Sequence, residues 1–281
     1  MNYGLAHIDK HFTPAMEDVA RWVHYVPSWS AAIEKQSNGV FENVYGFVDV
    51  ICQRICRPSS IIVNDVVVDV QRAYYCGYKG HHLLKWQGIM SPWYEFIYVC
   101  KLKVVLNLSL SWRLLSFCSG ILFGLSGPFL GTESDSECLQ SSGVLRMLAV
   151  IAWYYEYQFG IFGDPAYPRS PVLFKPFVAG AYISAAQRVY NYFGSRGRVT
   201  VEWFFGNVQQ YWATVCKWKT MRLHAVPVPR YMRAAVFLSN CINCHYPNQM
   251  ESYFDCKPPS LRTYFAIMRL PVQGVNEYPH Y

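Results

Sequence analysis

Short apolar runs alternate with amphipathic stretches along most of this chain, and that order limits the folds open to it. Runs rich in strand-forming residues predict strands near 44–51, 60–70, 80–89 and 149–162. Helical spacing of apolar residues predicts helices near 15–23, 137–148, 178–193, 198–212 and 228–245. Strands that come early and then alternate with helices predict an α/β fold with a mixed sheet flanked by helices.

Three carboxylates lie at informative places in this pattern. Asp49 interrupts an apolar run, and an unpaired charge in a buried strand is costly, so Asp49 lies at a strand edge or is held by a metal. Asp164 follows another apolar run, in a Gly-Asp-Pro turn. Glu202 lies on a predicted helix, away from its apolar stripe. An acid at a strand end and one on a later helix can share a metal ion, an arrangement that suits phosphodiester cleavage.

Composition excludes several classes of protein. Hydrophobic residues make up 52% of the 281 residues and charged residues 15%, which excludes a disordered or fibrous chain. The net charge is +7, and the basic residues gather between 196 and 233, around Glu202. A basic field beside carboxylates suits a binder of phosphate backbones, and an ordinary solvated face is the alternative.

The ten cysteines are relevant to the cellular compartment of the protein. Residues 1–13 contain no apolar stretch of a secretory signal, so we expect reduced thiols in a nuclear or cytoplasmic protein that is not secreted. Cys241 and Cys244 precede His245 at the spacing of a haem-attachment motif, but nothing else supports haem. A zinc site of Cys241, Cys244 and Cys256 is an alternative, but the second pair of ligands is not at the usual spacing of a zinc site.

Residues 104–125 contain one charged residue, Arg113, and are numerous enough to span a bilayer. Three interpretations stay open from composition alone: a membrane segment, a buried core helix, or an insertion foreign to the domain.

Five blocks in a fixed order carry a family resemblance. They are the strand with Asp49, the stretch from Gln71-Arg72 to Trp86-Gln87, Gly127-Pro128 to Ser134-Asp135-Ser136, Gly163-Asp164-Pro165-Ala166-Tyr167, and Arg198 to Val201-Glu202-Trp203-Phe204-Phe205-Gly206. In that order they resemble the nuclease domain of PIF/Harbinger-type DDE transposases, the DDE superfamily endonucleases. The resemblance covers about 39–96 and 124–265.

The resemblance implies an RNase H-like fold, with DNA as the substrate and an Asp-Asp-Glu triad that binds Mg²⁺ or Mn²⁺. Asp49 and Asp164 match the two aspartates, and Glu202 matches the glutamate. Asp135 matches a further aspartate, expected to be an auxiliary ligand. These residues are the predicted catalytic and metal-binding groups.

Basic residues in and near the same blocks are the candidate DNA contacts. They are Lys79, Lys85, Arg198, Lys217 and Lys219. Arg198 lies four residues before Glu202, on the same side of the predicted helix, where it orients that carboxylate or touches DNA.

The domain organisation departs from the family pattern. The interpretation is a remnant helical segment at 1–38, a nuclease domain at 39–256 and a tail at 257–281, with a separate DNA-binding protein as a candidate partner. Residues 97–123 have no counterpart in the pattern, and we interpret them as an insertion or translated intron. Val50 follows Asp49 where the family usually has glycine.

Three functional hypotheses follow. The first is a metal-dependent DNA endonuclease of transposon origin. The second is a catalytically inactive or domesticated descendant that binds DNA or protein. The third, a protein anchored in a membrane through 104–125, would place a bilayer between Asp49 and Asp164.

Overall fold

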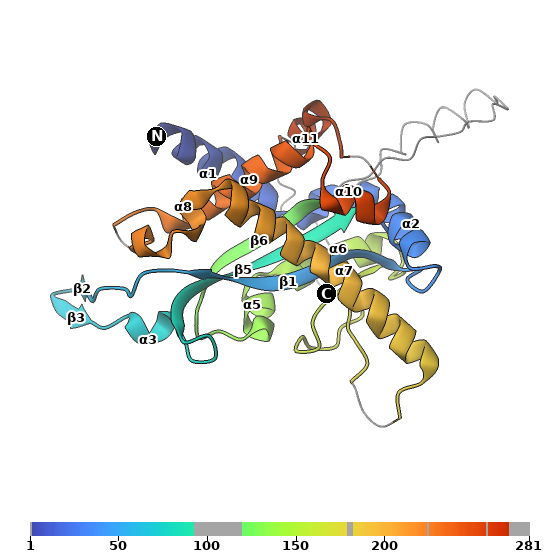
Figure 1. The fold of residues 1–281 in the computed structure, drawn as a ribbon, viewed down its shortest axis with the longest axis horizontal. Coiled ribbons are helices and arrows are strands. Elements are labelled where there is room, and N and C mark those ends of the chain that lie inside the picture. Colours follow the sequence, from blue (N-terminus) through green and yellow to red (C-terminus); the bar gives the residue numbers. More distant parts are fainter. Residues whose placement is uncertain (1, 93–119, 179–181, 224, 257, 270–281) are drawn as a thin grey trace.

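A mixed β-sheet forms the centre of the molecule (Figure 1). The computed structural model describes residues 2–92, 120–178, 182–223, 225–256 and 258–269. Within these residues the sheet has six strands: β1 (Val44–Arg54), β4 (Tyr75–Cys76), β5 (His81–Pro92), β6 (Gly120–Leu130), β7 (Gly160–Phe162) and β8 (Leu173–Phe174). Their order is β4-β5-β1-β7-β8, and β6 also pairs with β5. Because β1 is antiparallel to β5 and parallel to β7, the predicted mixed sheet is confirmed.

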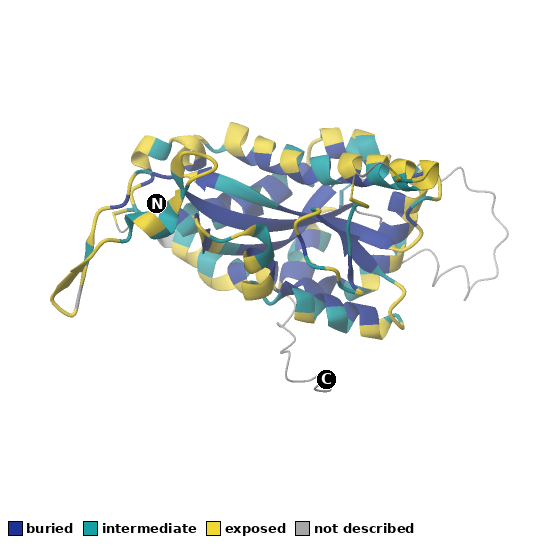
Figure 2. Cartoon of the chain, turned by 90° about the horizontal axis from the view of Figure 1, so that it is seen from below, coloured by how far each residue is buried: buried dark blue, intermediate teal, exposed yellow. Residues whose placement is uncertain are grey.

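Helices cover the sheet, and Figure 2 shows the buried strands lying between exposed helical surfaces. The helices before the first strand are α1 (Asn2–Glu17), the 3-10 helix η1 (Val19–Tyr25) and α2 (Val26–Gln36). Those that follow are α3 (Gln71–Tyr74), α5 (Asp135–Ser141), α6 (Val144–Tyr154), α7 (Ala185–Tyr211), α8 (Ala213–Cys216), η2 (Trp218–Thr220), α9 (Val228–Asn243), α10 (Gln249–Phe254) and α11 (Leu261–Met268). The predicted α/β fold with flanking helices is therefore confirmed.

Two predicted strands differ from the structure. Residues 60–70 form a hairpin, β2 (Ile61–Val63) and β3 (Val66–Val68), because Asn64 and Asp65 take positive φ angles that turn the chain back. The stretch 149–162 is helical as far as Tyr154 and becomes a strand only at Gly160.

Helix boundaries also differ. The helix predicted near 137–148 is two helices, α5 and α6, separated at Gly143, whose φ of 69° is left-handed. The N-cap of α5 is Ser134, and its side chain forms a reciprocal capping box with Glu137. The two helices predicted across 178–212 are one continuous helix, α7.

The predicted insertion at 97–123 is wrong at its C-terminal end. Residues 120–123 belong to β6, where Ile121, Leu122 and Phe123 are buried and β6 pairs with β5. The remainder of that insertion, 97–119, lies outside the described residues. Among the helices that the structure does describe, none has both the length and the apolar character needed to cross a membrane.

The predicted N-terminal segment and C-terminal tail both contribute to the main hydrophobic core. Val19, Trp22 and Trp29 from the first segment pack in the same core cluster as the sheet, and so does Tyr264 of α11. Burial of these large side chains is worth about 1.5–3 kcal/mol each, so both segments stabilise the same folded unit.

Asn240 on α9 holds one end of β6 in place. Its side-chain amide donates to the carbonyl oxygen of Leu122 at 2.9 Å and accepts from the backbone N–H of Leu122 at 3.1 Å. The amide nitrogen also lies 3.1 Å from the Tyr264 hydroxyl. Asn240 is fully buried, so it satisfies backbone groups that no neighbouring strand reaches.

Asn240→Leu should therefore lower the free energy of unfolding by about 2–4 kcal/mol, because each buried backbone group that loses its partner costs about 1–3 kcal/mol. Tyr264→Phe is the matched control, since it removes one hydrogen bond and should cost about 0.5–1.5 kcal/mol. Urea denaturation of both variants measures the difference. Equal losses would show that Asn240 does not anchor β6.

Candidate metal centre

The pairing of β1 with β7 brings two of the predicted ligands together. Phe47 on β1 is in register with Phe162 on β7, and the strands are parallel. Two residues further along each strand direction come Asp49 and Asp164. Side chains two positions apart share a face of a strand, so Asp49 lies on the face of β1 that carries Phe47, while Asp164 begins the turn just beyond β7.

Helix α7 crosses β1 and packs against it (Figure 1). A Cβ atom built on Gly197 would lie 2.1 Å from the Phe47 ring, and one built on Gly194 would lie 2.2 Å from the Phe162 ring. The two glycines therefore let the helix backbone rest on the two phenylalanine rings. This close approach brings the next residue of α7, Arg198, within reach of both strands.

Arg198 forms ion pairs with both aspartates. Its Nη2 atom lies 3.2 Å from Oδ2 of Asp49, and its Nη1 atom lies 2.8 Å from Oδ2 of Asp164. The other carboxylate oxygens accept from backbone N–H groups: Oδ1 of Asp49 from Val50 at 2.9 Å, and Oδ1 of Asp164 from Ala166 at 2.8 Å. Asp49 is thus neither at a strand edge nor alone, because a guanidinium neutralises it inside the sheet.

Burial and neighbouring charges together shift the pKa values of Asp49 and Arg198. Removal from water raises the pKa of the Asp49 carboxyl, and the positive charge of Arg198 only partly opposes this effect. Burial lowers the pKa of Arg198, but the charges of Asp49 and then Asp164 outweigh it and leave that pKa raised. Arg198 therefore stays charged while Asp49 holds its proton more tightly than a free aspartate.

This shift predicts the sign of a pH dependence. Because the folded state binds the proton of Asp49 more tightly than the unfolded chain does, the contribution of Asp49 to stability falls as pH rises from the ordinary aspartate range through its raised pKa. Asp49→Asn removes the titration. The free energy of unfolding of the variant minus that of the wild type should therefore increase with pH across that window and level off above it. Urea titrations in EDTA at several pH values measure this difference; a flat or decreasing difference contradicts the assignment.

Asp135 lies on the neighbouring helix α5, where it pairs with Lys85 of β5 at 3.1 Å. The Ser136 hydroxyl donates to the carbonyl oxygen of Ala166 at 2.6 Å, which ties the start of α5 to the turn that carries Asp164. Lys85 is 9% exposed, so its ammonium lies within the sheet rather than on an open surface. That Lys85 contacts DNA stays a prediction.

Tyr167 lies amid the three aspartates. Its ring is 1% exposed, and its hydroxyl is buried without a hydrogen-bond partner in the structure. Burial raises its pKa, and the charges of Asp49, Asp135 and Asp164 raise it further. The phenol thus stays neutral, and its ring belongs to the main hydrophobic core.

Glu202 stands apart from the aspartate pair. It is exposed on α7, one turn after Arg198, while Val201, Phe204 and Val208 of the same helix are buried. Among the residues that the structure describes, no three His, Cys, Asp or Glu side chains gather closely enough to hold a metal ion. This excludes a preformed three-carboxylate site there.

The same finding applies to the zinc alternative. Cys241 and Cys244 are free thiols, and Cys256 is disulfide-bonded, contrary to the expectation of reduced cysteines throughout. The three do not form a zinc site.

The other predicted DNA contacts are surface residues. Lys79 follows β4, and Lys217 and Lys219 flank Trp218 in η2; all three lysines are exposed. The guanidinium of Arg54, at the end of β1, lies 4.0 Å from the centre of the Trp218 ring. Arg54, Trp218 and Lys219 therefore gather beyond the end of β1.

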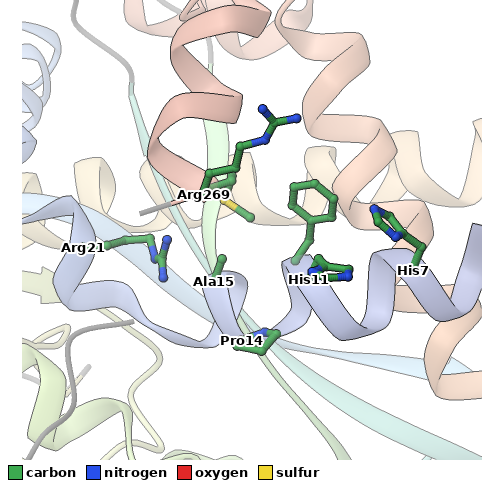
Figure 3. A pocket seen from close by; sticks show the side chains of 8 residues that line it. His7, His11, Pro14, Ala15, Arg21 and Arg269 are labelled. Carbon is green, nitrogen blue, oxygen red and sulfur yellow. The ribbon is translucent and has the colours of Figure 1, made fainter. Parts of the chain in front are cut away.

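A pocket of about 260 Å³ lies elsewhere, between α1 and α11 (Figure 3). Its lining residues are His7, His11, Phe12, Pro14, Ala15, Arg21, Met268 and Arg269. None of them is a carboxylate, so this pocket is not part of the aspartate centre.

The aspartate pair fits a divalent cation in its donor chemistry. Both Oδ2 atoms point to a single positive group, and hard carboxylate oxygens are the ligands that Mg²⁺ and Mn²⁺ prefer. The Oδ1 atom of each carboxylate accepts from a backbone N–H, which orients the Oδ2 atom toward Arg198. The pairing of Arg198 with both aspartates was not predicted from the sequence; the one available signal was the glycine pair at 194 and 197, which marks a close helix contact.

Comparison with known proteins gives one match. Residues 115–240 match the family model of the DDE superfamily endonucleases. The matched range contains Asp135, Asp164, Arg198 and Glu202, and it begins after Asp49. Comparisons with curated proteins and with solved structures gave no match. The mixed sheet flanked by helices agrees with the RNase H-like fold of such nucleases, and the match supports a transposase-derived DDE nuclease domain in this part of the chain.

Proposed function

We propose that this chain is a divalent-metal-dependent DNA endonuclease of PIF/Harbinger transposon origin, with Asp49, Asp164 and Glu202 as its catalytic triad. The observation that carries the proposal is the aspartate pair itself. Asp49 on β1 and Asp164 just after the parallel strand β7 direct their Oδ2 atoms to one cation, and Asp164 lies in the range that matches the endonuclease family model.

In this proposal Asp49 and Asp164 would hold a Mg²⁺ or Mn²⁺ ion, while the backbone N–H groups of Val50 and Ala166 keep the carboxylates oriented. The chemistry that such an ion supplies when bound is a lower pKa for the attacking water and neutralisation of charge at the scissile phosphate. Glu202 is the third carboxylate. Its Cα–Cβ bond tilts toward the N-terminal end of α7, which is the direction of Arg198 and the pair.

The proposed substrate is DNA. Lys79, Lys217 and Lys219 present exposed positive charge to the DNA backbone, and Asp135 supports the centre from α5 through its contact with Lys85. A separate DNA-binding protein is a candidate partner. We place the protein in the nucleus or the cytoplasm, where DNA and Mg²⁺ are available.

A second candidate function is a catalytically inactive module that binds DNA or protein. Two observations favour it: Arg198 takes the position between the aspartates, and Glu202 does not join them in the described structure.

Nicking of supercoiled plasmid separates the two functions. The purified chain should convert supercoiled to open-circular DNA with Mg²⁺ or Mn²⁺, and EDTA should abolish the conversion. DNA binding without any metal-dependent nicking supports the inactive module instead.

A further inference from the structure

Arg198 occupies the position that a divalent cation would take between Asp49 and Asp164. Its two terminal nitrogens contact one Oδ2 atom each, at 3.2 and 2.8 Å. The remaining oxygen of each carboxylate is engaged by a backbone N–H, so the Oδ2 atoms are the ones left for a metal. A guanidinium and a divalent ion compete for the same two oxygens.

The guanidinium is held firmly but is not fully satisfied. The Arg198 side chain is 19% exposed, and the Asp49 and Asp164 side chains are 11% and 27% exposed, so the ion pairs are largely shielded from water. Its Nε atom, however, is buried without a hydrogen-bond partner in the structure. A buried donor without a partner is unfavourable, so this position carries a cost that release of the side chain removes.

An alternative position for Arg198 exists on its own helix. Glu202 lies four residues later on α7, one turn away and exposed, and its charge already acts on Arg198. Arginine and glutamate four residues apart on a helix are neighbours. When Arg198 leaves the aspartates it can pair with Glu202 or with a phosphate of DNA that enters the site.

We infer that Arg198 is an internal counter-cation that closes the aspartate pair in the metal-free protein, so that a divalent cation binds only by displacing it. The inference rests on the proposed metal site and makes Arg198 a positioning residue that regulates metal entry. It also explains how two acids remain next to each other in a largely buried place: the arginine neutralises both until metal arrives.

Mn²⁺ binding tests this directly, measured by calorimetry on the full chain without DNA. Arg198→Gln should raise the affinity for Mn²⁺ by about tenfold or more, because the ion no longer displaces a charge-assisted pair. Arg188→Gln is the matched control; Arg188 is an exposed arginine of the same helix bonded to the carbonyl of Ile183, and its loss should leave the affinity unchanged. Adding Asp164→Asn to Arg198→Gln should abolish the gain, which locates the ion at the pair.

Arg198→Lys keeps the test decisive if the glutamine variant does not fold. A lysine ammonium lacks the fork that contacts both carboxylates at once, so its Mn²⁺ affinity should lie above that of the wild type. Thermal melts give a second readout: the glutamine variant should melt below the wild type in EDTA and gain more from a fixed Mn²⁺ concentration. Unchanged or weaker Mn²⁺ binding in the folded Arg198 variants overturns the inference.

The outcome is separable from that of the nuclease proposal. If Arg198→Gln binds Mn²⁺ more tightly and the wild type does not nick DNA, the role of Arg198 as an internal counter-cation is supported and the proposed nuclease activity is refuted. If the wild type nicks DNA with metal and Arg198→Gln binds Mn²⁺ with unchanged affinity, the proposed nuclease activity is supported and the counter-cation role of Arg198 is refuted.

Discussion

Asp164→Asn should lower metal-dependent nicking of supercoiled plasmid by about a hundredfold or more. Asp164 supplies one of the two Oδ2 atoms of the aspartate pair, and an amide oxygen carries no net charge with which to hold a divalent cation. Metal stabilisation of a phosphodiester transition state is worth several kcal/mol, and each 1.36 kcal/mol is a factor of ten in rate. The measurement is the initial rate of nicking in Mg²⁺ or Mn²⁺, with EDTA as background.

Asp65→Asn provides the matched control. Asp65 is an exposed carboxylate in the turn between β2 and β3, at a positive φ that asparagine accepts readily. The control variant should nick at the wild-type rate. If Asp164→Asn and wild type retain equal metal-dependent rates, Asp164 is not a catalytic ligand and the proposed triad is wrong.

Gly197→Ala should destabilise the protein by about 1–3 kcal/mol, the usual cost of overpacking a core. The added Cβ atom would lie 2.1 Å from the Phe47 ring, and both residues are buried between α7 and the sheet. Relief requires α7 to lift away from β1. That movement would also lengthen the contacts of Arg198, so Mn²⁺ affinity should change together with stability.

Gly206→Ala in the same helix is the matched control, because nothing lies within 4 Å of the Cβ atom that it would gain. An exposed alanine in a helix is favoured over glycine by about 0.5–1 kcal/mol, so this variant should be more stable than the wild type. Urea denaturation gives both values. A neutral Gly197→Ala would show that α7 does not depend on close contact with Phe47.

The sequence predicts elements best where the pattern is long and periodic. The central strands β1 and β5 and the helix α9 lie close to their predicted ranges. Helix α7 spans parts of both helices predicted at 178–193 and 198–212, and Gly194 and Gly197 lie in the gap between those two ranges. In the folded protein those glycines are packing positions, and the aromatic rings beneath them compensate for their low helix propensity.

The stretch around β6 shows a different limit of prediction from the amino-acid sequence. Its Leu- and Ser-rich composition, continuous with 97–119, carries no alternation, so residues 120–123 were assigned to an insertion. A strand buried on both faces has no polar side to alternate with, and β6 has this character from Gly120 to Leu125. Only its pairing with β5 and its contact with Asn240 identify it as part of the sheet.

For the candidate site, the amino-acid sequence alone yields the candidate acids, and their catalytic role stays a prediction. Asp49 lies on β1, and Asp164 follows β7, the strand that pairs with β1 in parallel. The group that neutralises their charges is seen only in the tertiary structure. Arg198 is separated from Asp49 by 149 positions, and no local pattern encodes a contact over that distance. The contact exists because two glycines let α7 settle onto the sheet, which brings one guanidinium between two carboxylates that could not otherwise share a buried face.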